Sequence, residues 1–477
     1  MLFPTLSFFL FFMAVFPLGI VCKRYVGIYK LFLVGINIVF YSFWGWHFAY
    51  ILLGSVGVNY LFNHLIWTSP PAKRLKTTYL VIALGLNLGF LAVCKYHSFF
   101  VDALLAMFNN WHLPFEVELL RITAPIGISF YTFRQIAHLV ESYKGEQQRV
   151  SILDFANYIT FFPQIASGPI SRPQDFYADL NAQEKYQYSI SAVGLSITSG
   201  VFKKYVLASY LFTIVSRPFS TPTGFNSLEL LVAVLAYACL IFVDFSGYSD
   251  LANGITMLLG FRPVPNFNRP YSASSLSEFW RKWHISLSNW LKDYLYIPMG
   301  GSKVIWYRKY FNLFMTMLLG GIWHGVGWQF ILWGAVHGVG LWLSHYLQWL
   351  WGELQNWQAK VIRALGIFCT FSFVCLTWIL FNSSSIEVAG QYIAHLFSFS
   401  SMNDLGEQGG GGVISELSLG VIAVVLGWQF VNPKIITWLE QTLDQYLVLT
   451  TIVLGGAMYL CLRLGPETVP PFIYFNF

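Results

Sequence analysis

Long apolar runs separated by short polar breaks fill the sequence, and this pattern predicts a series of helices that cross a membrane. One crossing needs about 20 apolar residues, or fewer where the bilayer thins. The predicted spans are residues 2–21, 31–46, 47–67, 78–95, 120–139, 155–170, 190–215, 228–249, 310–323, 328–350, 361–381, 413–431 and 446–464. Several are short or broken by glycine or proline, so some are expected to be re-entrant, which leaves about 11 to 13 crossings.

The predicted fold class is therefore an all-α polytopic membrane protein. Residues 1–477 are expected to form a single domain with a core at 120–350 and C-terminal helices and a tail at 351–477. The composition supports this class, because hydrophobic residues make up 56% of the chain and charged residues only 10%, whereas soluble domains carry about 25% charged residues. A disordered chain would combine low hydrophobicity with high charge. The six cysteines lie scattered without a C-x-x-C pair, which favours apolar packing over disulfides or metal binding.

The basic residues beside the first spans predict the orientation of the chain. Lys23 and Arg24 follow the apolar run 2–21, whereas a cleaved signal peptide carries its charge before the run. We therefore expect a retained helix whose C-terminal end is cytoplasmic and whose N-terminus faces outward, since basic loops stay on the cytoplasmic side. The next basic loop, Lys73 to Lys76, falls on the cytoplasmic side along the same path.

A polar interruption from Arg262 to Lys309 carries eight basic residues against two acidic ones, and its net charge of +6 equals that of the whole chain. The positive-inside bias of a cytoplasmic loop explains this charge. A docking face for an anionic donor also explains it, because guanidinium and ammonium groups pair well with phosphate. Both explanations can hold together, with Arg281, Lys282 and Lys292 as the candidate donor-binding residues. Nucleic-acid binding is not predicted, because the stretch is embedded between membrane segments.

Two histidine–glycine pairs stand thirteen residues apart in apolar surroundings, His324 within Gly320 to Gly325 (GGIWHG) and His337 within Trp333 to Gly338 (WGAVHG). The glycines allow another backbone or a substrate to approach closely. A neutral imidazole can take a proton from an alcohol and later return it, which acyl transfer to a hydroxyl requires. We expect this role for His324, with Trp323 and His337 in support, and the alternative is a buried histidine bonded to a carbonyl. A metal site is not expected, because no third ligand lies at suitable spacing.

The segment Phe279 to Leu291 (FWRKWHISLSNWL) places aromatic and apolar residues at helical spacing, with its charges elsewhere on the helical wheel. This pattern predicts one amphipathic helix at the cytoplasmic interface. Its aromatic face either anchors the helix in the membrane or forms a wall of a tunnel for the donor. His284 is a candidate second catalytic group, and Asn289 a supporting polar residue.

Two further segments carry polar or helix-breaking residues at membrane depth. Val243 to Asp250 (VDFSGYSD) ends an apolar run with two acids and two serines, which suggests an internal polar network that contains Asp244. Pairing with a buried arginine or with backbone donors is the simpler explanation of the same residues. Phe161 to Ile170 contains two prolines and a glycine, and such backbone is tolerated at this depth only where it is buried in protein or lines a cavity.

Four motifs together resemble the membrane-bound O-acyltransferase family. They are Asp244 to Asp250 (DFSGYSD), Phe279 to Trp290 (FWRKWHISLSNW), Gly320 to Gly325 (GGIWHG) and Trp333 to Gly338 (WGAVHG). The motifs are specific as a set and occur in the family's order. The resemblance is strong over residues 120–350 and points to the bacterial branch that acetylates exported polysaccharides such as alginate, cellulose or peptidoglycan.

The resemblance implies a ring of tilted helices around a thin central funnel. It places the family's catalytic histidine on His324 and a second motif histidine on His284. It implies a thioester donor, acetyl-CoA, that arrives from the cytoplasmic side of a bacterial inner membrane, with no other cofactor and with the acceptor and the N-terminus on the periplasmic side. The implied partners are a periplasmic acetyltransferase of the SGNH-hydrolase type, a polysaccharide synthesis and export complex, and membrane lipids, without nucleic acid.

The aromatic sequence Pro470 to Phe477 (PPFIYFNF) resembles the endings of related acyltransferases and the tail of a small partner peptide in teichoic-acid D-alanylation. The hydroxyl of Tyr474 could hold an acyl group transiently. An aromatic anchor at the membrane interface is the alternative.

Two other functions remain open at this point. One is transfer of D-alanine to teichoic acid from a carrier protein that docks on the same basic face. The other, from a different class, is a transporter or a polysaccharide-export channel. Secondary transporters often show paired repeats with broken helices in matching halves, whereas the histidine–glycine pairs occur here only in the second half of the chain.

Overall fold

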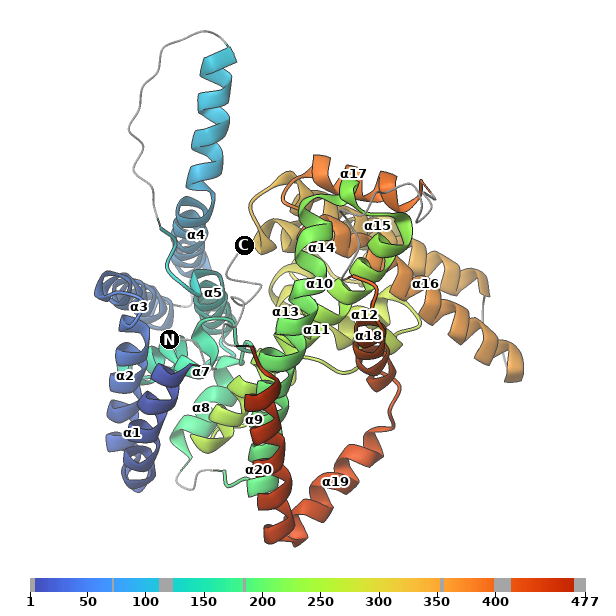
Figure 1. Ribbon diagram of the computed structural model, residues 1–477. Helices are drawn as coiled ribbons and strands as arrows, with labels where there is room; N and C mark the ends of the chain where they lie inside the picture. The colour runs from blue at the N-terminus through green and yellow to red at the C-terminus, as the bar shows by residue number, and fades with distance from the viewer. Residues whose placement is uncertain are drawn as a thin grey trace. The chain divides into compact units, whose positions relative to one another are not determined.

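The computed structural model describes residues 5–70, 73–110, 123–182, 186–351, 356–398 and 413–466. Within these ranges every regular element is a helix, which confirms the all-α class expected from the apolar runs (Figure 1). The chain forms two compact units, the first made of Met1–Tyr188 with Ile255–Val264 and the second of Ser189–Gly254 with Pro265–Phe477. Whether these units act as the single domain expected from the sequence stays a prediction.

Several of the described helices have the length and composition of membrane spans. Those that meet both criteria are Trp46–Thr68, Arg74–His97, Ser227–Leu258, Lys360–Asn382 and Leu447–Leu464. Shorter apolar helices are Ser7–Cys22, Val26–Ser42 and Glu416–Trp428. The protein is thus a membrane protein with several apolar helices, while the count of about 11 to 13 crossings and the orientation stay predictions.

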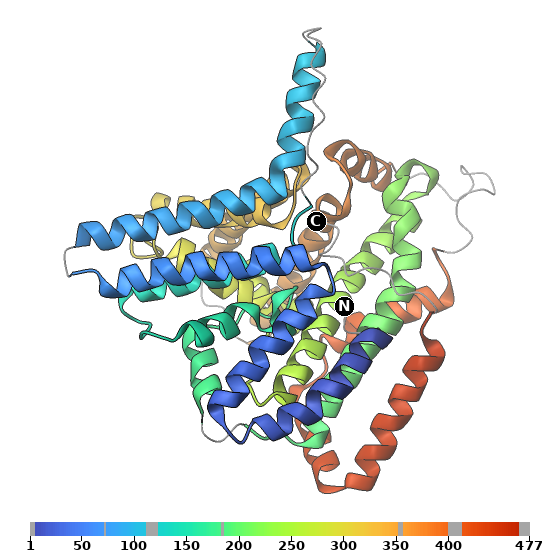
Figure 2. The same cartoon turned by 90° about the vertical axis from the view of Figure 1, so that its left-hand side faces the viewer.

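The helices of the first unit coincide with the predicted apolar runs, except for the last one, Pro173–Asn181, which lies in no predicted span. They are α1 (Leu6–Cys22), α2 (Val26–Ser42), α3 (Trp46–Thr68), α4 (Lys73–Asn110), α5 (Ile128–Lys144), α6 (Ile152–Thr160), α7 (Phe162–Ile165) and α8 (Pro173–Asn181). The long helix α4 bends along its length (Figure 2). Asn59 of α3 and Asn87 of α4 donate to each other's side-chain oxygens at 3.2 and 2.7 Å. Such amide pairs hold two helices together where lipid offers no competing partner.

Two helix boundaries differ from the predicted spans because glycines turn the chain there. The predicted span 31–46 corresponds to α2, which ends at Ser42, and Gly45 with a φ of 129° turns the chain into α3. The predicted span 120–139 corresponds to α5, which starts after Gly127 with a φ of 74°. A Cβ on Gly127 would collide with the carbonyl oxygen of Ile165, so this turn requires glycine.

The break predicted within residues 155–170 is confirmed. Helix α6 ends at Thr160, and the short α7 begins at Phe162, whose backbone N–H donates to Asn37 Oδ1 at 2.9 Å. Phe161 and Phe162 are fully buried. The irregular backbone is therefore enclosed by protein, as a break at membrane depth requires.

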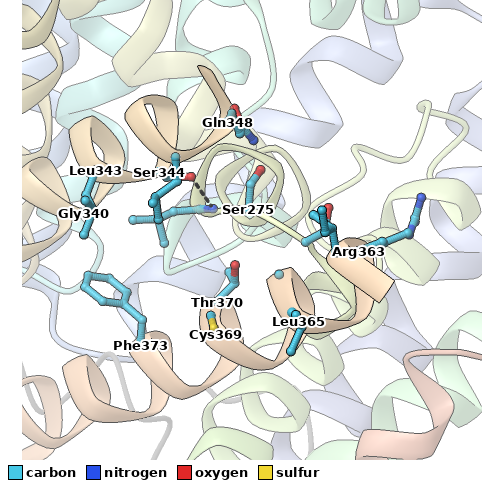
Figure 3. A pocket seen from close by; sticks show the side chains of 15 residues that line it. Ser275, Gly340, Leu343, Ser344, Gln348, Arg363, Leu365, Cys369, Thr370 and Phe373 are labelled. Atoms are coloured by element: carbon cyan, nitrogen blue, oxygen red, sulfur yellow. Dashed lines mark hydrogen bonds between the residues drawn. The ribbon is translucent and has the colours of Figure 1, made fainter. Parts of the chain in front are cut away.

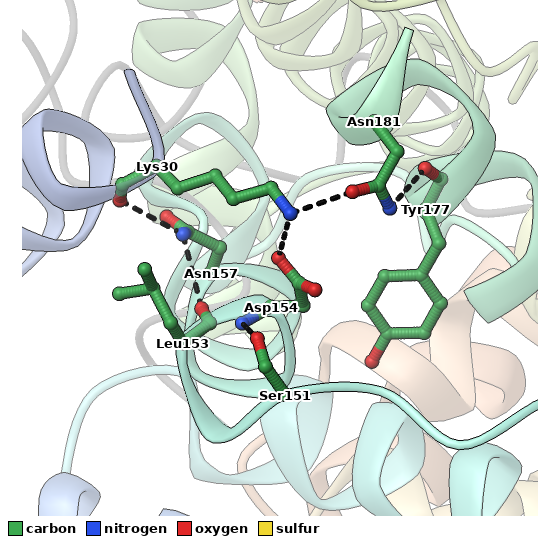
Figure 4. Close-up of polar contacts among 7 residues, drawn as sticks. All are labelled: Lys30, Ser151, Leu153, Asp154, Asn157, Tyr177 and Asn181. Atoms are coloured by element: carbon green, nitrogen blue, oxygen red, sulfur yellow. Dashed lines mark hydrogen bonds and ion pairs between the residues drawn. The ribbon is translucent and has the colours of Figure 1, made fainter. Parts of the chain in front are cut away.

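A polar cluster joins α2, α6 and α8 (Figure 4). Lys30 Nζ on α2 lies 2.6 Å from Asp154 Oδ1 on α6 and donates to Asn181 Oδ1 at the end of α8, also at 2.6 Å. Asn157 donates to the carbonyl oxygen of Lys30 at 2.9 Å, and Ser151 caps α6 by accepting from the Asp154 N–H at 3.1 Å. A mostly buried charge is tolerated when its partners are satisfied in this way.

The second unit contains the motif-bearing segments. Its helices are α9 (Ile190–Val201), α10 (Ala208–Ser220), α11 (Ser227–Leu258, with its last residues in the first unit), α12 (Leu276–Lys282), α13 (Ile285–Leu291), α14 (Trp306–His324), α15 (Trp328–Trp351), α16 (Asn356–Asn382), α17 (Ile386–Leu396), α18 (Glu416–Trp428), α19 (Pro433–Gln445) and α20 (Leu447–Leu464). In α11, 83% of the apolar window is buried, against 39% or less in the other candidate spans. Helix α11 is therefore a core helix that the others surround.

The predicted span 190–215 is not one regular α-helix. A π-helical turn, Phe202–Leu207, lies between α9 and α10. Where α9 crosses α11, a Cβ on Gly200 would lie 2.8 Å from the carbonyl oxygen of Gly247, so the two backbones touch. Single π turns inside an α-helix often accompany a functional site.

Glycines also hold α14 against α15, as expected from the histidine–glycine motifs. A Cβ on Gly334 would lie 2.5 Å from the carbonyl oxygen of Met317 and 3.2 Å from the Cα of Gly321. A Cβ on Gly321 would in turn collide with the carbonyl oxygen of Phe330. The close approach that the glycines allow is thus between two helix backbones, and it sets the spacing of the two histidines.

We expect Gly334→Ala to destabilise the protein by about 1–3 kcal/mol, the usual effect of overpacking. The added methyl group has only backbone atoms of α14 to displace, so the hairpin must open. Thermal unfolding of the purified protein measures this effect. Gly390→Ala on α17 is the control, because its Cβ would meet nothing within 4 Å. Equal unfolding midpoints for the two variants would contradict the prediction.

Candidate functional site

His324 is the last residue of α14, and Gly325 follows it as the C-terminal cap. Its side chain is only 5% exposed. The ring centroids of Trp323, Trp333 and Phe381 lie 5.0, 5.1 and 5.2 Å from that of His324, and each ring stands edge-on to the imidazole. This aromatic cage keeps bulk water away, so charges that develop at His324 interact strongly with nearby dipoles.

His337 lies one helical turn beyond Trp333 on α15, with their ring centroids 4.6 Å apart. It is fully buried, and its Nε2 lies 3.0 Å from Thr377 Oγ1. The Thr377 hydroxyl donates to the carbonyl oxygen of Val374 at 2.9 Å, so it accepts from His337 Nε2–H. The lone pair of His337 is then on Nδ1. The Nε2 of His337 is therefore hydrogen-bonded, as in a structural histidine. Trp333 contacts the rings of both His337 and His324.

Trp280 of α12 connects a third motif to this cluster. Its ring centroid lies 5.2 Å from that of His337 and 5.8 Å from that of Trp333. The Phe279 to Leu291 segment thus contacts the WGAVHG motif inside the second unit. Sequence patterns placed each motif on its own element, and only the packing of α12 against α15 joins them.

The prediction of one continuous amphipathic helix over Phe279 to Leu291 is wrong. Helix α12 ends at Lys282, α13 begins at Ile285, and His284 between them has a φ of 42° in the left-handed region. Trp283 is 1% exposed and packs against Phe279 with ring centroids 5.6 Å apart. The helical spacing is real but short, and tertiary packing breaks it at a position where a non-glycine residue is strained.

Asn266 holds this strained turn and was not found by the sequence analysis. Its carbonyl oxygen accepts from the Ile285 N–H at 2.9 Å. Its side-chain Oδ1 lies 3.0 Å from His284 Nδ1 and accepts from the Ser286 hydroxyl at 2.9 Å. Its Nδ2 donates to Ser249 Oγ at 3.0 Å. The amide is thereby fixed with its oxygen toward the imidazole, so His284 carries its proton on Nδ1 and its lone pair on Nε2.

His284 also contacts the DFSGYSD motif. Phe245 stands edge-on to its ring at a centroid distance of 4.6 Å, and Ser249 belongs to the same helix α11. The histidine is fully buried, and burial lowers its pKa to about 3. The imidazole is therefore neutral near pH 7, which a proton acceptor requires.

Asp244 and Asp250 pair with lysines. Lys204 on the π turn forms a buried ion pair with Asp244, and Lys203 Nζ lies 2.7 Å from Asp250 Oδ2. Pairing with a buried cation is thus confirmed for Asp244, with lysine in place of the expected arginine. The two consecutive lysines both reach α11 from the π turn, which explains why this turn interrupts the predicted helix.

The three candidate donor-binding cations differ in their surroundings. Lys282 Nζ lies 2.8 Å from Glu278 Oε1 and donates to Ser272 Oγ at 3.1 Å. Burial alone would raise the pKa of Glu278, but Lys282 and two donors from Ser274 outweigh burial and lower it to about 2. Arg281 is exposed and forms no ion pair within the described residues. Lys292 is exposed, 3.7 Å from Asp293 Oδ1 and 3.5 Å from Asn289 Oδ1.

Lys282 is therefore already paired with Glu278 and Ser272, which leaves Arg281 and Lys292 as the better candidates for binding an anion. The contact of Asn289 with Lys292 is the interaction that the structure gives for this predicted supporting residue. Tyr474, the candidate acyl relay, lies outside the described residues. The unpredicted residues of the site are Asn266, Thr377 and Phe381, which lie outside the four motifs. Ser249 belongs to the DFSGYSD motif, but its contact with Asn266 was not predicted.

Residues 99–385 match the sequence profile of the membrane-bound O-acyltransferase family. A protein named probable alginate O-acetylase from Pseudomonas aeruginosa is 34% identical over 78% of this chain and 70% of its own length. A peptidoglycan O-acetyltransferase from Helicobacter pylori is 35% identical over 76% of this chain and 72% of its own length. A teichoic acid D-alanyltransferase from Streptococcus thermophilus is 29% identical over 54% of this chain and 68% of its own length.

Proposed function

Because this chain belongs to the membrane-bound O-acyltransferase family, we propose that it is an O-acetyltransferase for an exported polysaccharide of the alginate or cellulose type. It takes an acetyl group from acetyl-CoA at the cytoplasmic side of a bacterial inner membrane and delivers it to the periplasmic side, where the N-terminus lies. The acyltransferase class follows from the family, and it leaves the export-channel alternative without support. The site observation that carries the proposal is the buried His324 in its aromatic cage.

Acyl transfer from a thioester to a hydroxyl requires a residue that accepts the hydroxyl proton and then donates it to the leaving group. The acceptor hydroxyl attacks the thioester carbonyl carbon, a C–O bond forms and the C–S bond breaks. His324 takes the hydroxyl proton and returns it to the leaving thiolate. His284 is the second candidate catalytic histidine. The lone pair on its Nε2 can accept a hydrogen bond. Nε2 could donate a hydrogen bond to an oxyanion only after the imidazole is protonated.

The charge of the basic stretch and the family resemblance support the proposed donor and partners. The phosphates of acetyl-CoA are expected at Arg281 and Lys292, the two exposed cations among the three candidate donor-binding residues. A periplasmic acetyltransferase of the SGNH-hydrolase type then completes transfer to the polymer within a synthesis and export complex. No cofactor beyond the donor is required for this reaction.

Product analysis tests the proposal directly. A strain that lacks the gene is complemented with wild type or with an empty vector, and proton NMR measures O-acetyl groups on the exported polysaccharide. We expect acetyl groups only with the wild type and an unchanged polymer yield. A change in polymer yield without a change in acetylation would contradict the proposal.

D-alanyl transfer to teichoic acid is the second candidate, favoured by the similarity to a teichoic acid D-alanyltransferase over 54% of this chain. The donor would then be a D-alanyl thioester on a carrier protein. The same strains distinguish the two candidates, because ester-linked D-alanine in the cell wall would follow the gene while polysaccharide acetylation would not.

We also propose that Tyr474 relays the acyl group from the donor to the periplasmic acceptor. Tyr474→Phe removes only the hydroxyl, so we expect transfer to be abolished while the protein stays abundant in the membrane. O-acetyl content of the polymer and immunoblotting of membranes measure the two quantities. Tyr459→Phe is a matched control on α20, since its exposed side chain contacts Arg463 rather than any motif. Full acetylation in the Tyr474→Phe variant would contradict the relay and favour an interfacial anchor as the role of the tail Pro470 to Phe477.

A further inference from the structure

A groove of ≈ 670 Å³ lies in the second unit, bordered by the start of α12, by α15 and by α16 (Figure 3). Gly340 of α15 and Phe373 of α16 stand at one end, and Gln348 and Arg363 stand at the other. Arg363 and Phe373 are ten residues apart on one helix, which corresponds to about 15 Å along the groove. The groove is separate from the motif residues, although the ring of Phe373 lies 5.4 Å from that of His337.

The body of the groove is apolar and open to the surroundings of the protein. Leu343 and Leu347 from α15 are 46% and 41% exposed, and Leu365 from α16 is 49% exposed. Helix α16 supplies one of the candidate membrane spans, Lys360–Asn382. Leu365 is exposed on this span and is expected to face hydrocarbon, and Leu343 and Leu347 of α15 line the same groove. The apolar part of the groove is therefore expected to be covered by an acyl chain rather than by water.

The other end of the groove has the features of a membrane interface. Arg363 stands in the first turn of the span, and an arginine at this position reaches the headgroup layer. On the neighbouring helix, Trp342, Tyr346 and Trp349 form a ladder of stacked rings with centroids 6.1 and 5.9 Å apart, and all three are exposed. Exposed tryptophan and tyrosine mark the level where hydrocarbon meets headgroups.

Among the described residues, the charge at this end is positive. Arg363 is exposed and forms no ion pair within the described residues, and Lys360 lies one turn earlier on the same helix. No acidic side chain lines the groove in the described part of the chain, and Gln348 adds a polar group at the same end. Ser274 also lines the groove, but its N–H and hydroxyl donate to Glu278, which is paired with Lys282. A guanidinium binds a phosphate through two parallel hydrogen bonds, so this end suits a phosphodiester.

We propose that this groove binds an anionic phospholipid, with its phosphate at Arg363 and one acyl chain between α15 and α16 toward Phe373. The bound lipid fills the space between the start of α12 and the two helices that border it. It thereby supports α15, which carries His337, from the membrane side. This site is independent of the reaction that the protein catalyses.

A cysteine inside the groove allows a direct test. Cys369 lines the groove and is exposed, whereas Cys94, Cys239, Cys375 and Cys461 are buried. Cys22, which is partly exposed, is replaced by serine so that Cys369 alone reacts quickly. Full-length protein is placed in nanodiscs of phosphatidylcholine alone or with phosphatidylglycerol as a minority lipid, and the rate of maleimide alkylation is measured.

We expect phosphatidylglycerol to slow alkylation of Cys369 about fivefold, the factor that one interfacial arginine contributes toward an anionic lipid. Arg363→Gln should abolish this protection, Arg363→Lys should retain part of it, and Lys434→Gln on α19 should leave it intact. Equal rates in the two kinds of nanodisc would overturn the proposal. So would protection that survives Arg363→Gln, or equal protection by inorganic phosphate in pure phosphatidylcholine, which would indicate a site for free phosphate.

Discussion

We expect His324→Ala to lower the rate of acyl transfer by about 10²–10⁴-fold, the usual contribution of a general acid–base residue. The residue is buried among Trp323, Trp333 and Phe381, so bulk water cannot easily replace it as the proton carrier. The assay is release of CoA thiol from acetyl-CoA by membranes that contain matched amounts of protein, together with the O-acetyl content of the polymer.

Two further variants separate chemistry from folding. His324→Gln keeps a side chain of similar size in the aromatic cage, and we expect it to be as inactive as the alanine variant while unfolding at the wild-type temperature. His345→Gln is the matched control, because His345 is a half-buried histidine on α15 that contacts Ser277 rather than the cage. Wild-type transfer by His324→Ala would refute the assignment and favour His337 or His284.

We expect Asn266→Ala to lower kcat by about 10²-fold, the effect of misplacing a reacting group by about 1 Å. The substitution removes the acceptor of His284 Nδ1–H and the hydrogen bond to the Ser286 hydroxyl, both of which fix the imidazole in its strained turn. Because these contacts position the histidine rather than the donor, KM for acetyl-CoA should change little. Initial rates over a range of donor concentrations separate the two constants.

Asn266→Asp gives a result that a purely structural residue would not. The carboxylate still accepts from His284 Nδ1–H but favours the charged imidazolium, which raises the pKa of His284 by about 1–3 units. A histidine with a raised pKa is protonated at higher pH and no longer accepts a proton there. The acid limb of the kcat–pH profile should therefore move to higher pH.

Within the described residues, the elements that carry and contact this histidine hold three ion pairs, and the unpaired Arg281 beside it is exposed to solvent. On α11 and the preceding π turn, Lys203 pairs with Asp250 and Lys204 with Asp244. On α12, Lys282 pairs with Glu278. A shifted limb in Asn266→Asp therefore reports the new carboxylate, and Ser249→Ala, which removes only the hydroxyl beside the amide, should shift nothing. Lower activity with an unmoved limb would mean that Asn266 only stabilises the fold.

The sequence alone determined where most of the long apolar helices lie, while short helices such as α8 and α17 lie outside the predicted spans. The apolar run 47–67 is α3 at Trp46–Thr68, and the run 328–350 is α15 at Trp328–Trp351. Hydrophobic runs depend on neighbouring residues, so a window of sequence contains the information needed to find them. The histidine–glycine motifs were visible for the same reason, because an ionisable residue and glycines within an apolar run stand out locally.

Tertiary structure alone decided how the motifs meet. The turn at His284 breaks a helical spacing that continues in the sequence, because Asn266, eighteen residues earlier, holds the chain in another conformation. The π turn after α9 brings Lys203 and Lys204 to acids 47 and 40 residues away. These hydrogen bonds and ion pairs join residues whose separation along the chain leaves no periodic pattern, so their geometry exists only once the helices have packed.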